Sequence, residues 1–229
     1  MKIDIWSDIA CPWCFIGKRR FEKALSTFAH RDDVEIHWHS YQLDPSLPAH
    51  YDGTEVDYLV ASKGMPRENV EQMITTVAAQ AAEEGLHYDF DHLVVANSLP
   101  GHHLLHLAAR HGVANDVKDA LLSAHFEKGQ DIGDAQMLVA IGEQHGLSAS
   151  DVQDALADPE LTREIEQDFA TAHAYGISGV PFFVLDEKYG VSGAQPSEVF
   201  GQALEQAWRD AHPLIVAEQV GPACGPDGC

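Results

Sequence analysis

The spacing of apolar residues changes along this chain, and each change predicts a change of secondary structure. Residues 2–6 alternate between apolar and polar side chains, which is typical of a strand. Residues 21–28 then carry apolar side chains at helical spacing, and residues 34–38 alternate again. The opening of the chain therefore predicts a β-α-β unit, in which a helix crosses between two parallel strands.

Helical spacing continues from about residue 45 to residue 175 and predicts amphipathic helices at about residues 70–81, 104–111, 117–122, 137–141 and 161–172, and one that begins near residue 148. Strand spacing then returns, and residues 199–208 predict a closing amphipathic helix. We expect an α/β protein in which a domain made of residues 1–44 and 176–212 is interrupted by an all-helical domain, residues 45–175. Residues 213–229 are rich in Gly and Pro and predict a flexible tail.

Two cysteines lie where the first strand gives way to the first helix, in the motif Cys11-Pro12-Trp13-Cys14. A thiol at the first turn of a helix faces unpaired N–H groups and the positive end of the helix dipole, which favour the thiolate. We expect Cys11 to cap the helix, with Pro12 at the first helical position. Cys14 should be the more buried sulfur, so that Cys11 exchanges with a substrate and Cys14 releases it. The same spacing also fits two core cysteines or half of a zinc site.

This motif, together with two later segments, resembles a thioredoxin-fold oxidoreductase of the DsbA superfamily, in its cytosolic FrnE-like branch. The branch is related to the 2-hydroxychromene-2-carboxylate isomerases. The resemblance covers nearly the whole chain and is carried by Trp6–Cys14, Asn97–His106 and Gly176–Ala194. It implies a thioredoxin fold interrupted by an all-helical insertion.

The resemblance also implies the surroundings of the cysteine pair. The peptide bond between Val180 and Pro181 should be cis and lie beside the pair, where the preceding loop binds substrate backbone. Pro12, Trp13, Val180 and Pro181 would then support the catalytic cysteines.

Two positions depart from the family pattern. The periplasmic members carry Cys-Pro-His-Cys, so Trp13 supplies no positive charge here, and the pKa of Cys11 should be lowered less than with histidine at that position. The family often has Ala-His-Arg where this chain has Gly101-His102-His103. His102 keeps the pattern and is our candidate for a residue of the substrate cleft.

A second cysteine pair, Cys224 and Cys229, ends the chain, and the Gly and Pro between its members suit a tight loop. Some FrnE-like proteins resemble this chain in having a second C-terminal pair. The pair could relay electrons to Cys11 and Cys14, because a short tether gives a high effective concentration. Alternatively its thiols are exposed and oxidise incidentally, or both pairs together bind a metal ion.

Charge excludes several classes of partner. Asp and Glu total 36 against 14 Lys and Arg, and the resulting net charge of −22 is repelled by nucleic acids and by anionic membranes. The first residues do not predict a signal peptide and no apolar run is long enough to span a membrane, so we expect a cytoplasmic protein. No motif for a nucleotide, flavin or haem is present, so we expect no cofactor.

The histidines include two pairs with spacings that can chelate a metal ion, His102 with His106 and His37 with His39. We expect these four side chains to be solvated or hydrogen-bonded at the surface, and we expect no metal site.

The leading prediction is a thiol–disulfide oxidoreductase that acts on disulfide- or thiol-containing proteins or small molecules, with glutathione as a candidate partner. The alternative is a glutathione-dependent isomerase or transferase of the 2-hydroxychromene-2-carboxylate isomerase type. Those enzymes use a single serine or cysteine, so Cys14 disfavours it. A third interpretation is a non-catalytic zinc-binding or chaperone-like module.

Overall fold

The opening of the chain forms the β-α-β unit that its apolar spacing predicts. Strand β1 (Lys2–Ser7) pairs in parallel with strand β2 (Glu35–Ser40), and helix α1 (Pro12–Thr27) crosses between them. A short 3-10 helix, η1 (Arg31–Asp33), leads into β2. The register runs without a bulge along the whole length of both strands. The end of β1 therefore delivers the chain directly to the first turn of α1.

The other half of the sheet comes from the far end of the described chain, which is residues 1–213 of this computed structural model. Strands β3 (Phe182–Leu185) and β4 (Tyr189–Ser192) complete a four-stranded sheet in the order β2-β1-β3-β4. Strand β3 is antiparallel to both of its neighbours, and helix α9 (Ser197–Ala211) follows the sheet. The loop that leads into β3 thus lies next to the end of β1.

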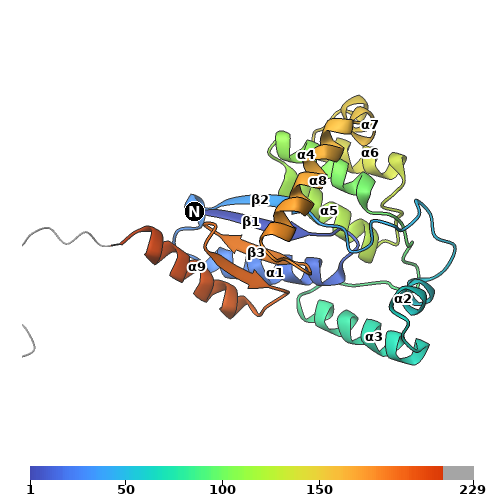
Figure 1. The fold of residues 1–229 in the computed structure, drawn as a ribbon, viewed down its shortest axis with the longest axis horizontal. Helices are drawn as coiled ribbons and strands as arrows, with labels where there is room; N and C mark the ends of the chain where they lie inside the picture. Colours follow the sequence, from blue (N-terminus) through green and yellow to red (C-terminus); the bar gives the residue numbers. More distant parts are fainter. Residues whose placement is uncertain (214–229) are drawn as a thin grey trace, which may run out of the picture.

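Helices cover both faces of the sheet (Figure 1), so that its residues alternate between two apolar cores. On one face, Ile5 packs with Phe200 of α9 and with α1. On the other face, Trp6 packs under helix α8 (Pro159–Ala174). The indole N–H of Trp6 donates to the carbonyl of Asp168 at 3.0 Å, so this large buried side chain keeps its hydrogen bond.

The helices between β2 and β3 form the insertion that the sequence predicts. Besides α8, they are α2 (Glu55–Lys63), α3 (Arg67–Glu83), α4 (Leu99–Arg110), α5 (Ala114–Phe126), α6 (Ala135–Gln144) and α7 (Ala149–Leu156). Helices α4 to α8 share an apolar core that contains Leu104, Leu121 and Leu138. The chain therefore has a thioredoxin fold interrupted by a helical insertion, which confirms the predicted fold class. Within residues 1–213, no helix combines the length and the apolar character needed to cross a membrane.

Two helices of the insertion differ from what the sequence predicts. Helix α2 was not expected; it has no fully buried residue, so its apolar spacing is weak, and a capping box between Thr54 and Asp57 begins it. Helix α4 begins at Leu99, whereas apolar spacing predicts a start near Leu104. A proline such as Pro100 usually ends a helix. Here it lies in the first turn, where backbone N–H groups have no hydrogen-bond partner within the helix, so its missing N–H costs nothing.

Candidate active site

The motif Cys11-Pro12-Trp13-Cys14 forms the start of α1. Cys11 is the N-cap residue, with extended backbone angles of φ −105° and ψ 112°, and Pro12 occupies the first turn. The backbone N–H of Cys14 donates to the carbonyl of Cys11 at 3.0 Å. Within residues 1–213 neither thiol forms a disulfide, and both are buried, with exposed fractions of 3% for Cys11 and 1% for Cys14, whereas 37% of Trp13 is exposed. One helical turn therefore holds both sulfurs, with an indole between them that reaches solvent.

The loop before β3 lies against this turn. The Val180–Pro181 peptide bond is cis, and the Cys11 thiol donates to the carbonyl of Val180 at 3.5 Å. Gly17, further along α1, leaves room for the proline ring, since a Cβ atom there would lie 2.8 Å from Cγ of Pro181. The absence of a side chain at Gly17 therefore lets the loop pack directly on the helix that carries the cysteines.

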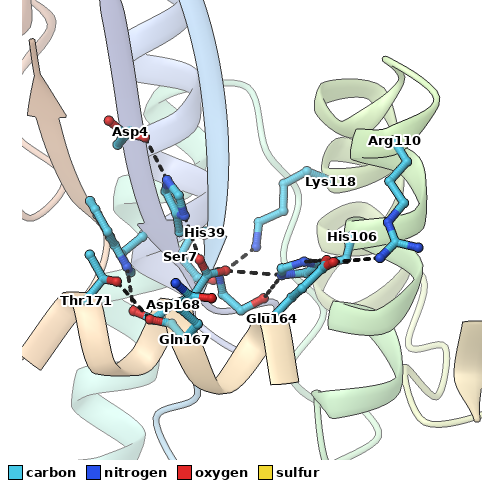
Figure 2. Close-up of polar contacts among 12 residues, drawn as sticks. Asp4, Ser7, His39, His106, Arg110, Lys118, Glu164, Gln167, Asp168 and Thr171 are labelled. Carbon is cyan, nitrogen blue, oxygen red and sulfur yellow. Dashed lines mark hydrogen bonds and ion pairs between the residues drawn. The ribbon is translucent and has the colours of Figure 1, made fainter. Parts of the chain in front are cut away.

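Three buried ionisable side chains lie close to the cysteines, namely Asp8, His102 and Lys118. Nε2 of His102 lies 3.2 Å from Oδ1 of Asp8, and the backbone N–H of Leu43 donates to Oδ2 at 2.7 Å. Burial opposes the charge of Asp8, but these hydrogen bonds bring its pKa to about 2. Lys118 donates to the carbonyl of Ser7 at 3.4 Å (Figure 2), and burial lowers its pKa to about 8.

The two thiols hold their protons unequally. The hydrogen bond to Cys14 and burial raise the pKa of Cys11, and the carboxylate of Asp8 raises it further. Burial opposes a charge on Cys14 too, but the hydrogen bond from Cys11 and the charge of Lys118 lower the pKa of Cys14. The expected lowering at Cys11 is therefore not found: its side chain makes no capping hydrogen bond, and Asp8 opposes its charge. Of the two thiols, Cys14 therefore gives up its proton more readily.

A cavity of about 290 Å³ opens beside Cys11. Its lining includes Cys11, Trp13 and Val180 but not Cys14. Most of the remaining wall is apolar and comes from α2, α3 and the segment between α3 and α4. These apolar residues include Leu59, Met73, Ile74, Val77 and Phe90. A ligand in this cavity would therefore meet the sulfur of Cys11 and not that of Cys14.

Comparison with known proteins agrees with this geometry. The family model described as the DSBA-like thioredoxin domain matches residues 2–205. The chain belongs to this family. A crystal structure of a probable DsbA oxidoreductase from Streptomyces coelicolor is 44% identical in sequence, covers 100% of this chain and 98% of its own, and superposes with a TM-score of 0.87. The predicted family is confirmed, and with it a family of oxidoreductases.

More distant relatives share the fold of this DsbA-like protein. The uncharacterized protein YwbO of Bacillus subtilis (strain 168) is 26% identical over 88% of this chain and 94% of its own length. The cytosolic disulfide reductase DsbM from Pseudomonas aeruginosa, solved with GSH, is 17% identical, covers 91% of this chain and 100% of its own, and has a TM-score of 0.65. A 2-hydroxychromene-2-carboxylate isomerase is 14% identical, covers 92% and 98%, and has a TM-score of 0.70.

Two side chains that the sequence analysis missed hold the start of α1 in this DsbA-like protein. The hydroxyl of Tyr88 donates to the carbonyl of Pro12 at 2.6 Å. Arg20 donates from its guanidinium to the carbonyl of Ala194 at 2.8 Å and pairs with Glu84 at 2.6 Å. Both contacts join segments that are far apart in the sequence, so no local pattern marks either residue.

His102 is not placed as we expected. It is fully buried in α4 and does not line the cavity. Its ring is hydrogen-bonded to Asp8, and Asp8 does line the cavity. The expectation of a surface histidine is therefore wrong for this residue. His106, one turn further on, is also mostly buried, with Nε2 3.0 Å from Oγ of Ser40 and 3.1 Å from Oδ2 of Asp168.

The two members of the second histidine pair, His37 and His39, also lie in different surroundings. His39 lies between two carboxylates, 2.7 Å from Asp168 and 2.7 Å from Asp4 (Figure 2), whereas the side chain of His37 is 39% exposed. His39 and His106 thus meet on Asp168, a pairing that no local spacing shows. In the part of the chain that the structure describes, no group of three or more His, Cys, Asp and Glu side chains is arranged to hold a metal ion.

The structure thus brings most of the sequence-predicted site residues together around one helix start. They are Cys11, Pro12, Trp13, Cys14, Val180 and Pro181. The second cysteine pair, Cys224 and Cys229, lies outside the described residues 1–213. The electron relay, the exposed tail and the shared metal site that we predicted for it therefore stay predictions.

Proposed function

We propose that this protein is a thiol–disulfide oxidoreductase in which Cys11 exchanges with the substrate and Cys14 completes the exchange. The observation that carries the proposal is the asymmetry of the pair, because Cys11 lines the cavity and Cys14 does not. The proposed substrates are disulfide- or thiol-containing proteins or small molecules. The confirmed oxidoreductase family supports this chemistry.

In the proposed mechanism, a reduced pair passes two electrons to a substrate disulfide in two exchanges. The Cys11 thiol loses its proton, its sulfur attacks one substrate sulfur, the substrate S–S bond breaks, and the departing substrate thiolate takes up a proton. Cys14 then attacks Sγ of Cys11, the second substrate thiolate leaves, and the pair becomes a disulfide. The lowered pKa of Cys14 favours the second exchange, in which Cys14 attacks as a thiolate, and the reverse sequence oxidises two substrate thiols.

We infer a role in substrate binding for the loop of Val180 and Pro181. The loop borders the cavity, and the carbonyl of Val180 is within hydrogen-bonding distance of Cys11. Residues 1–44 and 176–212 would then supply the reacting sulfurs and this loop, while residues 45–175 supply most of the rest of the cavity wall. The structural neighbour solved with GSH supports glutathione as a small thiol partner, and its printed description as cytosolic supports a cytoplasmic location for this chain.

Reduction of insulin disulfides by dithiothreitol tests the proposal. The wild type should accelerate the reaction, and Cys11→Ser should return it to the uncatalysed rate, because the attacking sulfur is lost. Reduced Cys14→Ser, freed of dithiothreitol and mixed with insulin, should keep the first exchange and accumulate a mixed disulfide on Cys11, which mass spectrometry of the intact protein detects. Equal turnover by the wild type and Cys11→Ser would contradict the proposed function.

A glutathione-dependent isomerase is the second candidate, and the size and apolar lining of the cavity favour it, since both suit a small organic substrate. An isomerase of this kind needs one sulfur and no resolving partner. Isomerisation of a hydroxychromene carboxylate at the same rate by the wild type and Cys14→Ser, in the presence of glutathione, would support this candidate over the first.

A further inference from the structure

Glu55 is a carboxyl group in the wall of the cavity with nothing to neutralise it. It is the first residue of α2, is partly buried and lines the cavity. Within residues 1–213, no hydrogen bond or ion pair reaches its side chain, and burial alone raises its pKa to about 7. A desolvated carboxylate without a partner is costly, so a cation that entered the cavity would be bound strongly by it.

His125 is a second polar group in this wall. It belongs to α5, only 3% of it is exposed, and among residues 1–213 its Nδ1 atom has no hydrogen-bond partner. Burial lowers its pKa to about 4, so at neutral pH it adds no positive charge to the cavity that would compete with a cation for Glu55.

The other charged groups of the lining favour a cation over an anion. Asp8 and Asp44 add negative charge, although hydrogen bonds already satisfy both: Asp8 with His102 and Asp44 with the hydroxyl of Tyr58 at 2.9 Å. Lys63 also lines the cavity, but it is exposed and ends α2, at the opposite end of that helix from Glu55.

We propose that this cavity binds a small disulfide or thiol that carries an ammonium group, with the ammonium paired to Glu55 and the sulfur presented to Cys11. The inference rests on the proposed function and names a substrate class for that same site. The volume of about 290 Å³ suits a small molecule, and the apolar wall suits its hydrocarbon chain. For a diamine disulfide, the substrate S–S bond breaks, two aminothiols leave and Cys11 and Cys14 form a disulfide.

The test is a single turnover of the reduced protein, which needs no further reductant, with three small disulfides of similar size. They are cystamine, which carries two ammonium groups, bis(2-hydroxyethyl) disulfide, which is neutral, and dithiodiglycolate, which carries two carboxylates. The rate is followed at about pH 8, where Glu55, with a pKa of about 7, is ionised. Cystamine should react about tenfold faster than the neutral disulfide, as expected for one charge-assisted hydrogen bond, and dithiodiglycolate slowest.

Glu55→Gln should remove most of the preference for cystamine over the neutral disulfide. The matched control is Glu68→Gln, which makes the same change of net charge at an exposed position of α3 outside the cavity, and should keep the preference. Thermal unfolding of both variants checks that they fold.

A cystamine preference that survives Glu55→Gln would overturn the inference while leaving the proposed function intact. The absence of a preference in the wild type would overturn it in the same way. Equal rates for the wild type and Cys11→Ser with every disulfide would instead contradict the proposed function, and the inference with it. The two failures are therefore distinguishable.

Discussion

Lys118 and Asp8 act on the two sulfurs in opposite directions. The ammonium of Lys118 lowers the pKa of Cys14, whereas the carboxylate of Asp8 raises that of Cys11. Buried charges act strongly on their neighbours because little water screens them. The pKa of Lys118 itself is about 8, so its effect on Cys14 fades as pH rises above that value. At the scale of single residues, the pKa of Cys14 thus depends in part on one lysine from the insertion.

Replacing Lys118 by methionine should raise the pKa of Cys14 and slow disulfide exchange about tenfold near neutral pH, because the attacking Cys14 thiolate loses its neighbouring cation. The ultraviolet absorbance of the thiolate, followed against pH in the wild type and in the variant, measures the shift. Lys128→Met is the matched control, since Lys128 is exposed. An unchanged midpoint in Lys118→Met would contradict the role of this charge.

The sequence predicts those site residues that are local and misses those that arrive from distant segments. Cys11, Pro12 and Cys14 follow from one motif at a strand-to-helix junction, where capping and periodicity can be read within a short stretch. Lys118 and Tyr88 reach the same turn only through the packing of the insertion. A single sequence records which faces of the helices are apolar, but not which faces meet.

At the scale of elements, α1 and the loop before β3 must approach closely for Val180 to contact Cys11. Gly17 is the point of contact, because a Cβ atom there would lie only 2.8 Å from the ring of Pro181. Glycine is otherwise unfavourable inside a helix by about 1 kcal/mol relative to alanine. Glycine at position 17 therefore lowers the intrinsic stability of the helix but allows the loop to pack against it.

Gly17→Ala and Gly201→Ala should have opposite effects on the protein. Gly201 lies in α9 with nothing within 4 Å of an added Cβ atom, so alanine there should stabilise the protein by about 0.5–1 kcal/mol. Alanine at Gly17 gains the same propensity but must displace Pro181, so it should lower both the stability and the rate of disulfide exchange. Urea unfolding and insulin turnover measure the two effects. Full activity in Gly17→Ala would show that the loop tolerates displacement.

The insertion also shows why the sequence predicts some helices and not others. Helix α2 buries no residue completely, so it lacks the apolar stripe by which α3 and α8 can be recognised. It nevertheless carries Glu55 and Leu59 to the cavity. Helix α3 lines the cavity too, but it also buries Val70, Val77 and Ala81, and these residues give its sequence a periodic signal that α2 lacks.

At the scale of the whole molecule, one carboxylate of α8 joins the insertion to the sheet. Asp168 lies 2.7 Å from Nδ1 of His39, accepts from the backbone N–H of Ser40 at 2.7 Å and lies 3.1 Å from Nε2 of His106 (Figure 2). The other ring nitrogen of His39 faces Asp4 at 2.7 Å. Since ionised carboxylates only accept hydrogen bonds, this arrangement favours the protonated form of His39, which donates from both ring nitrogens.

The pKa values of Asp168 and His39 determine how their contribution to the free energy of unfolding depends on pH. Burial opposes the charge of Asp168, but the hydrogen bonds from His106 and His39 lower its pKa from 3.8 to about 2. Its stabilisation is therefore present above about pH 4 and is lost as pH falls toward 2. Burial likewise opposes the charge of His39, but Asp168 and Asp4 raise its pKa above 6.5. That stabilisation is present below about pH 6.5 and is lost as pH rises through the raised value.

Asp168→Asn should therefore destabilise the protein most between about pH 4 and 6.5, by about 2 kcal/mol, and less on either side. Asparagine keeps the acceptor for Ser40 but removes the charge that both histidines face. The free energy of unfolding in urea, measured for wild type and variant at about pH 3, 5 and 9, gives the difference. The buried histidines His102, His103 and His125, whose pKa values are lowered, make both proteins less stable in acid and cancel in that difference. A difference that stays constant from pH 3 to 9 would mean that Asp168 joins the insertion to the sheet through geometry alone, without the charge.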